Sequence, residues 1–476
     1  MAGTDNSQLQ MSFDSSGNRF RDKLNSGDFL LFVEVDSSLS DKEESKQRAK
    51  DIVDAVSQID CISARLAFTS QQAGDESKDV IAFASELVKP QMRDQHLLYL
   101  TGKALPYSEA SERISMCATD GWKNIIPVSG DAVVGKSVKE HASIPFTQSV
   151  HILADIQKTK DSQHHAGCVV NPYKYTPENL YSQYFQLIKK IKLGASYIVT
   201  QSGWDMLKLQ ELRWFLTSRD LYTPSIARLE LLTPERADDI VEGKCPGLHA
   251  SPDFQAILAD EARFSNMQFE AAQWRRLQLQ AAGCQFLGYS GIQLKGLKSK
   301  EHVNIACKRI AEALVEFKNF DEWKEAYESH LARGNMAPYP YRFYMFKGLF
   351  TTDHLHGAPT LNDGKLPECG PLEKIKYKFT KKVLSHDFKK SATGNFLKKI
   401  LVGSCSSTVS ELRDTHYMCM GLCPKGLVNG PCGGTQPSGD CEIQDKECVH
   451  GQRMRRAVWL NELNVLEENY LPPSAD

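Results

Sequence analysis

The C-terminal part of the chain concentrates side chains that bind metals. Five of the thirteen cysteines fall within about thirty residues: Cys419, Cys423, Cys432, Cys441 and Cys448. Glycine and proline residues between them permit the tight turns that could bring several thiolates around one ion. A structural zinc takes four such ligands, and so does a [4Fe–4S] cluster. We therefore expect a metal site here, and the alternative is a loop of free cysteines.

Three polar residues stand near the ends of otherwise apolar, β-rich runs. Glu34 lies in LFVEVD, Asp131 follows PVSG, and Gln201 ends YIVTQ. In a barrel of parallel strands the functional face is the C-terminal end of the strands, so these residues are the first candidates. Taken singly, each is also compatible with an ordinary rim or turn position.

Short apolar runs alternate with longer segments of helical period, and these elements must position the candidates. The expected strands are 29–35, 60–68, 97–101, 124–129, 167–171, 196–201, 225–232 and 284–291. Helices are expected between them, among others at 44–59, 107–121, 178–194 and 268–283. This order favours the α/β class and a (β/α)8 TIM-type barrel. The first strand is not followed by G-x-G-x-x-G, which a Rossmann fold would need.

With 476 residues the chain exceeds what one hydrophobic core usually serves, so we expect several parts. Residues 1–27 are polar and are predicted to form a disordered leader, and residues 28–318 to form the barrel. Residues 319–395 are predicted to be a linker that wraps over the barrel or joins it to the next module. Residues 396–476 are predicted to be the small cysteine-rich, metal-binding domain.

Charge and hydropathy argue against several classes of protein. The formal net charge is −2, which argues against a general nucleic-acid or membrane-surface binder. No apolar run is long enough to span a bilayer, and the N-terminal residues lack the apolar segment of a secretory signal. We therefore expect a cytoplasmic protein with no nucleic-acid or membrane partner, and a homo-oligomer stays open. Without a secretory signal, metal binding is favoured over a disulfide framework for the clustered cysteines.

The barrel region resembles the methylenetetrahydrofolate reductase family over about residues 28–310. The first strand of that family carries a Glu between apolar residues, here Val33-Glu34-Val35, and its fourth ends in Arg-Gly-Asp, here Ser129-Gly130-Asp131. Its sixth strand has an Ala-Gly-Ala … Ile-Thr-Gln … Asp pattern, which corresponds to Leu193-Gly194-Ala195, Val199-Thr200-Gln201 and Asp205, preceded by Lys190.

The C-terminal region is similar to a domain of the methylenetetrahydrofolate reductase partner subunits of acetogens. The similarity rests on the run CPKGLVNGPCGG at 423–434. Those relatives carry an upstream Cys-x2-Cys-x2-Cys, whereas this chain has Cys405 followed by Ser406, Ser407 and Thr408. The resemblance therefore implies one site, a structural zinc or one remaining [4Fe–4S] cluster, rather than a relay of clusters.

The resemblance implies an oxidoreductase that interconverts 5,10-methylene- and 5-methyl-tetrahydrofolate. An acid must open the ring of the methylene form, and the exposed iminium then accepts a hydride, which a bound flavin would supply. Glu34 would be the acid, since desolvation of a buried carboxyl raises its pKa. Asp131 would bind the pterin, Gln201 would orient the folate, and Gly130, Asp131 and Lys190 would contact the flavin. The implied partners are a tetrahydrofolate derivative and an electron donor, either NAD(P)H or a protein.

Several positions depart from the family pattern where the flavin would lie. Ser129 replaces an arginine, residues 171–174 replace Tyr-Pro-Glu-x-His, and residues 202–204 replace an aromatic run. FAD is the expected cofactor, with FMN or no flavin as alternatives. Two other functions stay open: a flavin-free folate-binding protein that transfers methyl groups, and a non-catalytic electron-transfer or scaffold subunit of a reductase complex.

Overall fold

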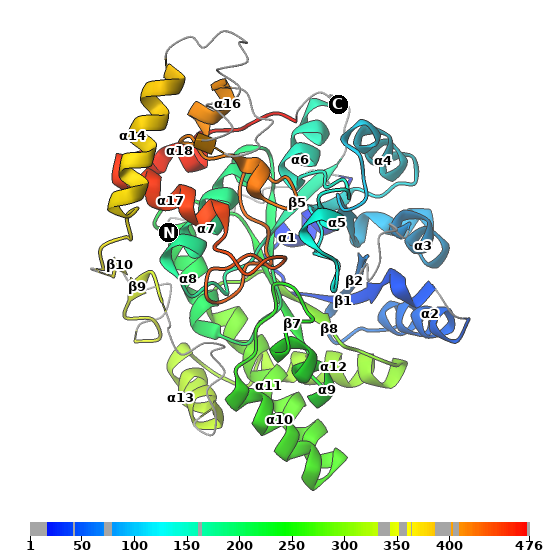
Figure 1. The fold of residues 1–476 in the computed structure, drawn as a ribbon. Coiled ribbons are helices and arrows are strands. Elements are labelled where there is room, and N and C mark those ends of the chain that lie inside the picture. Colours follow the sequence, from blue (N-terminus) through cyan, green and yellow to red (C-terminus); the bar gives the residue numbers. More distant parts are fainter. Residues whose placement is uncertain are drawn as a thin grey trace, which may run out of the picture.

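Eight parallel strands close into a barrel, and helices cover its outer face (Figure 1). The computed structural model describes residues 17–40, 43–70, 79–159, 164–331, 343–351, 359–362, 364–385, 401–402 and 409–473. Each strand pairs with the next in the chain, and the eighth pairs with the first, so this sheet has no edge. The predicted (β/α)8 barrel of the α/β class is confirmed.

Seven of the eight strands lie within three residues of the predicted runs. The strands are β1 (Leu30–Asp36), β2 (Ser63–Thr69), β3 (Leu97–Thr101), β4 (Asn124–Val128), β5 (His165–Val170), β6 (Tyr197–Thr200), β7 (Ser225–Glu230) and β8 (Gly291–Lys295). Parallel strands in such a barrel are buried on both faces, which explains their nearly continuous apolar sequences.

The prediction of the eighth strand at 284–291 is wrong. Residues up to Phe286 belong to the long helix α11 (Asn266–Phe286), and the strand begins only at Gly291. Cys284 is apolar and fully buried in the last turn of that helix. A short apolar run of this kind fits a buried helix end as well as it fits a strand. The reversal comes at Gly288, whose φ of +76° places it in the left-handed region that glycine adopts readily.

The helices that follow the strands often begin at a capping side chain. They are α2 (Glu43–Ser57), α3 (Val80–Leu87), α4 (Tyr107–Thr119), α5 (Val138–His141), α6 (Ser149–Lys158), α7 (Pro177–Lys192), α8 (Met206–Thr217), α9 (Pro234–Val241), α10 (Pro252–Phe264), α11 and α12 (Lys300–Ala313), with short 3-10 turns η1 (Ser37–Ser40) and η2 (Pro90–Gln95). Asp79, Ser251 and Ser299, for example, each accept a hydrogen bond from a first-turn amide. Such caps satisfy amides that have no partner within the helix.

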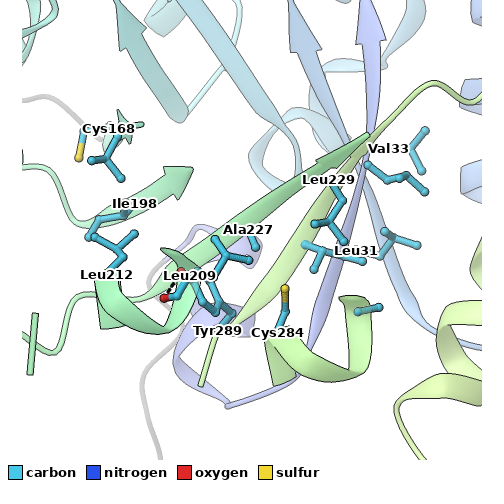
Figure 2. Close-up of a cluster of buried hydrophobic side chains, with 14 of the residues drawn as sticks. Leu31, Val33, Cys168, Ile198, Leu209, Leu212, Ala227, Leu229, Cys284 and Tyr289 are labelled. Atoms are coloured by element: carbon cyan, nitrogen blue, oxygen red, sulfur yellow. Dashed lines mark hydrogen bonds between the residues drawn. The ribbon is translucent and has the colours of Figure 1, made fainter. Parts of the chain in front are cut away.

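The main hydrophobic core lies between the barrel wall and its helices (Figure 2). Leu31 of β1 and Leu229 of β7 pack there with Leu209 of α8 and Cys284 of α11. Tyr289, just before β8, is buried in the same layer and donates its hydroxyl to the carbonyl of Leu209 at 3.0 Å. This layer holds the strands whose C-terminal ends form the pocket described below.

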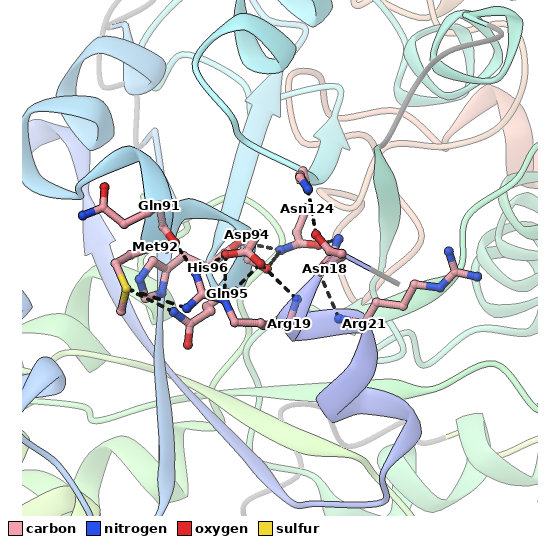
Figure 3. A network of polar contacts seen from close by, with 11 residues as sticks. Asn18, Arg19, Arg21, Gln91, Met92, Asp94, Gln95, His96 and Asn124 are labelled. Carbon is pink, nitrogen blue, oxygen red and sulfur yellow. Dashed lines mark hydrogen bonds and ion pairs between the residues drawn. The ribbon is translucent and has the colours of Figure 1, made fainter. Parts of the chain in front are cut away.

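A short helix, α1 (Arg19–Asn25), closes the N-terminal end of the barrel. Phe20 is 1% exposed, and its ring packs edge-on against Phe32 and Tyr197 at centroid distances of 5.5 and 5.0 Å. Asn18 caps the helix and donates to Asn124 Oδ1 at 2.7 Å (Figure 3). The prediction of disorder is therefore wrong for this helix, which is too short to be stable alone and is held by tertiary contacts. Residues 1–16 lie outside the described part.

The segment after the barrel first packs against the barrel wall. Helix α13 (Phe320–Leu331) contacts α11, and residues 343–351 lie along α8. Lys208 of α8 donates to the carbonyl of Phe343 at 2.7 Å, and the hydroxyl of Tyr344 donates to Asp205 at 2.7 Å. A small antiparallel pair, β9 (Phe346–Lys347) and β10 (Thr360–Leu361), follows.

The C-terminal domain is built from short helices and long irregular loops. Its elements are α14 (Pro371–Ser385), α16 (Val409–Asp414), η3 (Met420–Leu422), α17 (Val449–Leu460) and α18 (Leu463–Glu468). Tyr377 of α14 shares a small core with Tyr417 and Trp459, so α14 belongs to this domain although it was predicted in the linker 319–395. Helices α17 and α18 pack on α7 of the barrel. No helix in the described ranges is both long and apolar enough to cross a membrane.

Candidate functional site

A pocket of about 480 Å³ opens at the C-terminal ends of the barrel strands. Its walls include Asp36 at the end of β1, Asp131 after β4 and Gln201 after β6. Residues 431–433 of the C-terminal domain complete the wall. Pockets of this size bind small molecules or parts of cofactors, and this end of a barrel is where enzymes of this fold place their sites.

Glu34 lies beneath the pocket instead of lining it. Its side chain is 2% exposed, and both carboxylate oxygens accept hydrogen bonds from Arg228, Nη2 to Oε1 at 2.6 Å and Nε to Oε2 at 2.8 Å. Gln293 donates to Oε2 at 2.8 Å, and the hydroxyl of Thr69 donates to Oε1 at 3.2 Å. The carboxylate is thus enclosed by donors.

These contacts overturn the expectation of a raised pKa for Glu34. Burial does push its pKa upward, but Arg228 and Lys295 together with the hydrogen bonds lower the pKa to about 2. A buried carboxyl behaves as an acid near neutral pH only where no cation pairs with it. Glu34 is therefore ionised in this arrangement.

Arg228, on β7, is the central residue that the sequence analysis missed. Besides its two bonds to Glu34, its Nη1 donates to Gln201 Oε1 at 3.0 Å, and its guanidinium lines the pocket floor. Gln201 Oε1 also accepts from the backbone N–H of Ser202 at 3.0 Å. The planar fork of an arginine can bind one carboxylate and still present N–H groups to a ligand. The sequence did carry a signal for this residue, namely an arginine between apolar residues of a predicted strand.

Asp131 is the predicted residue whose carboxyl reaches the pocket. It is accessible to solvent, yet surrounding protein desolvates it enough to raise its pKa, while Lys425 acts in the opposite direction. The preceding Gly130 has φ +90°, and a Cβ there would lie 2.5 Å from the Cβ of Lys103. The glycine therefore lets the turn approach Lys103 closely.

Lys190 and other cations give the pocket a positive balance. Lys190, on α7, is buried in the wall, where its ammonium donates to the carbonyl of Val169 at 2.7 Å, and burial lowers its pKa. Six lining residues are cationic and three are carboxylic acids: Lys103, Lys190, Arg228, Arg236, Lys244 and Lys295, against Asp36, Asp131 and Glu230. Arg228, Arg236 and Lys244 also pair with carboxylates, which offsets part of this balance, and the remainder suits an anionic ligand.

The C-terminal domain is fixed to the pocket through its backbone. Asn171 donates to the carbonyl of Gly433 at 2.7 Å, and Lys174 donates to the same carbonyl at 2.9 Å. Gln183 of α7 donates to the carbonyl of Cys432 at 2.5 Å, and Lys189 donates to that of Asn429 at 2.8 Å. Barrel side chains thus bind a row of carbonyls in an extended loop and hold it at the pocket edge.

The five cysteines predicted as metal ligands do not behave alike. Cys419 is disulfide-bonded, whereas Cys423, Cys432, Cys441 and Cys448 are free thiols. Burial is the main cause of the raised pKa of each free thiol, and neighbouring thiols add to it, as Cys423 and Cys441 do for Cys448. Among the residues that the structure describes, no three His, Cys, Asp or Glu side chains form a group placed to hold a metal ion.

The comparisons with known proteins agree with the resemblance seen in the sequence. Residues 389–475 match the family described as "Methylene-tetrahydrofolate reductase C terminal". The chain thus joins a closed barrel to a region similar to that domain. No curated protein matches it. A chain of the tryptophan synthase α2β2 complex from Pyrococcus furiosus is similar at 11% identity and a TM-score of 0.32, over 61% of this chain and 98% of that one. At that score it adds nothing to the barrel topology described above.

Proposed function

We propose that this chain is an oxidoreductase of the methylenetetrahydrofolate reductase type, which interconverts 5,10-methylene- and 5-methyl-tetrahydrofolate. The observation that carries the proposal is the composition of the pocket wall. Residues 431–433 lie in the region similar to the reductase C-terminal domain, and they face strand-end residues of the barrel across the cavity. A domain of that family therefore contributes directly to the site where a small molecule would bind.

The charges of the pocket suit a tetrahydrofolate derivative. Its glutamate tail is anionic, and the rim presents the cationic side chains of Arg236, Lys244 and Lys295. Its pterin ring carries donors and acceptors that the carboxyl of Asp131 and the amide of Gln201 could bind. The pocket therefore offers a charged rim for the tail and a polar floor for the ring.

Asp131 is the better candidate for the acid in this reaction. Opening the five-membered ring requires a proton on the departing nitrogen, and Glu34 is ionised and covered by Arg228. Asp131 is accessible and its pKa is raised, so it would hold a proton at a higher pH than an ordinary aspartate. Arg228 and Gln201 would then orient the ligand.

A flavin fits the chemistry of the wall in part. Lys103 and Lys190 supply positive charge for a phosphate or ribityl group, and Gly130 permits close approach of the turn, whereas Ser129 replaces the arginine of the family pattern. Bound FAD, or FMN in its place, would supply the hydride. The electron donor, NAD(P)H or a protein, and a cytoplasmic location belong to the same proposal.

The four free thiols of the C-terminal domain suit a metal by number and type, although in the described structure no three of them stand in a metal-binding arrangement, so binding would have to draw them together. Cys423, Cys432, Cys441 and Cys448 would bind one structural Zn²⁺ or one [4Fe–4S] cluster. The buried ammonium of Lys174 lies close enough to Cys432 and Cys448 for their charges to affect its pKa, so it would offset part of the negative charge of four thiolates. Metal analysis of the purified protein tests this. Less than half an equivalent of zinc, and of iron, per chain would contradict it.

A spectrum of gently purified protein tests the proposed reaction. We expect flavin absorbance that bleaches when 5-methyl-tetrahydrofolate is added without oxygen, because the methyl group then returns a hydride. An Asp131→Asn variant, which cannot supply the proton for ring opening, is expected to bind the same flavin but, once that flavin is reduced, to be reoxidised by 5,10-methylene-tetrahydrofolate at least a hundredfold more slowly. Protein purified without flavin, or flavin whose absorbance does not change when the folate is added, would contradict the proposal.

A second function is favoured by the contacts of Glu34. The position that the resemblance assigns to the acid is occupied by a carboxylate sealed under Arg228, and Ser129 departs from the flavin-binding pattern. Both features suit a flavin-free protein that binds a folate and passes its methyl group to a partner. Saturable binding of 5-methyl-tetrahydrofolate by colourless protein, with transfer of labelled methyl, would select this function over the first.

A further inference from the structure

A buried ion pair of the C-terminal domain lies beside the pocket. Lys425 Nζ is 2.5 Å from Glu442 Oε1, and the two side chains are 2% and 1% exposed. Removing two charges from water is costly, and the gain in stability from such a pair is small. Pairs of this kind are best explained where they fix the geometry of their surroundings.

The pair is directed at the turn that follows β4. Lys425 Nζ also donates to the carbonyl of Gly130 at 2.9 Å and lies 5.4 Å from the ring centroid of Phe146. The carboxylate of Glu442 accepts from the thiol of Cys432 at 2.9 Å and pairs with Lys425. Lys425 therefore contacts the turn that contains Asp131, and Glu442 holds Lys425 in place.

The barrel holds both ends of the turn and the C-terminal domain holds its middle. Ser129 Oγ accepts from the backbone N–H of Ser149 at 3.1 Å, and the backbone N–H of Val133 donates to His141 Nε2 at 2.9 Å. Between them Gly130, at φ +90°, can adopt many backbone conformations, and its carbonyl accepts from Lys425, roughly three hundred residues away in the sequence. The position of Asp131 thus depends in part on a separate domain.

We propose that Lys425 and Glu442 are positioning residues, which hold the Gly130–Ala132 turn so that Asp131 stays in the pocket wall. The C-terminal domain then acts on the barrel site in two ways, by forming its wall at residues 431–433 and by placing its carboxyl. The identity of the ligand rests on the proposed function, whereas the placement of the turn does not.

Hydrogen exchange of the turn tests the placement without any ligand. In Lys425→Met we expect amides 130–132 to exchange at least about tenfold faster, because loss of a charged hydrogen bond destabilises the closed turn by that factor or more. Arg219→Met is the matched control, since it breaks another ion pair between the barrel and the C-terminal domain, Arg219 Nη1 to Glu467 Oε2 at 2.9 Å, outside the pocket lining. That variant is expected to leave the turn unchanged.

A second variant covers the case in which Lys425→Met fails to fold. Glu442→Gln keeps the size of the side chain and removes its charge, and it is expected to speed exchange in the same amides. Lys425→Arg retains the charge and is expected to preserve most of the protection. Unchanged exchange in Glu442→Gln, or equal effects of Lys425→Met and Arg219→Met on the turn, would overturn the proposal.

The pH midpoint of 5-methyl-tetrahydrofolate binding separates a positioning role from a purely structural one, because a purely structural role would leave that midpoint unchanged. Lys425 lowers the pKa of Asp131, so in Lys425→Met the pH midpoint of binding should move up. The Arg219→Met variant should keep the midpoint of the parent protein, and an unmoved midpoint in Lys425→Met contradicts the role. If the parent protein binds no folate, the proposed function fails, and the exchange experiment still decides the placement.

Discussion

The two ends of the barrel are closed by segments of opposite character. At the N-terminal end, α1 inserts Phe20 and Leu24 into a mainly apolar layer with Phe32 and Tyr197. At the C-terminal end, the loop 425–435 is bound through hydrogen bonds from barrel side chains to its carbonyls, and it leaves a charged cavity beneath it. The same eight strands therefore carry one end that is filled with side chains and one end that keeps a cavity.

The difference shows how one fold separates stability from chemistry. Apolar packing fills space and excludes ligands, so the N-terminal end can contribute only to stability. Hydrogen bonds to backbone carbonyls hold a loop at a fixed distance without filling the space below it. The C-terminal end can therefore keep Asp131 and Arg228 accessible while it remains ordered.

The largest expected effect is on activity at the open end. Asp131→Asn should lower the rate of the proposed reaction about 10²- to 10⁴-fold, which is the usual contribution of a general acid. Stability should not fall, because a carboxyl with a raised pKa is unfavourable when ionised, and the amide removes that charge at neutral pH. Single-turnover rates and urea unfolding at pH 7 measure both. Asp36→Asn, at the other pocket carboxyl with a raised pKa, is the control, and a larger loss there would reassign the acid.

The packed end should give the largest effect on stability. Phe20→Ala removes a buried aromatic ring and should lower the free energy of unfolding by about 3–5 kcal/mol, with folate affinity unchanged. The control is Phe264→Ala, since Phe264 is 71% exposed and its removal should cost well under 1 kcal/mol. Urea titrations compare the two variants. Equal effects would show that α1 does not close the barrel in solution.

Arg228→Met should lower stability in a way that depends on pH. It leaves Glu34 buried without its cation, which typically costs about 3 kcal/mol. In the parent protein the pKa of Glu34 is about 2, below its ordinary value, so its contribution is complete above about pH 4.5 and is lost as the pH falls toward 2. In the variant burial raises this pKa, so the deficit should shrink between pH 8 and pH 5.

The matched control for Arg228→Met is another largely buried arginine, for which the described part of the chain provides no carboxylate partner. Arg213 donates to Ser225 Oγ at 2.9 Å and to the carbonyl of Thr223 at 3.3 Å. Arg213→Met should cost stability to the same extent at pH 5 and pH 8. Urea unfolding at the two values separates the variants, and a pH-independent deficit in Arg228→Met would refute the account of Glu34.

The smallest effect is expected at the rim of the packed end. Arg19 forms an ion pair with Asp94, but its side chain is 45% exposed. Exposed pairs contribute about 0–1 kcal/mol, so Arg19→Ala should shift the unfolding midpoint only slightly, and 0.5 M salt should reduce the shift further. A loss above 2 kcal/mol would mean that polar contacts, rather than Phe20, fix the helix.

The sequence predicted the barrel well because its signal is repetitive. Apolar strand runs alternate with helical segments around the whole barrel, and each repeat supports the others, so one misplaced strand at 284–291 did not change the conclusion. The site was harder to predict, since it depends on which strand-end side chains pair across the barrel. Glu34 and Arg228 are far apart in the sequence, and their pairing inverts the expected shift in the pKa of Glu34.

The helix α1 and the pair Lys425–Glu442 were missed for a related reason. Seven residues with one buried aromatic carry no periodic pattern, so α1 resembles a polar leader until its barrel partners are known. A lone Lys and a lone Glu among cysteines look like surface charges. Their side chains are only 2% and 1% exposed because the barrel covers them.

The contact between Lys425 and Gly130 also sets an order of events during synthesis. The two residues are 295 positions apart, so the β4 turn leaves the ribosome long before the lysine that tethers it. Domains generally fold as units from the N-terminus onward. The barrel and helix α1 can therefore assemble while the chain is still growing. The pocket is completed only after translation has passed the last cysteines. A chain cut short before that point would leave a closed barrel and an unfinished site.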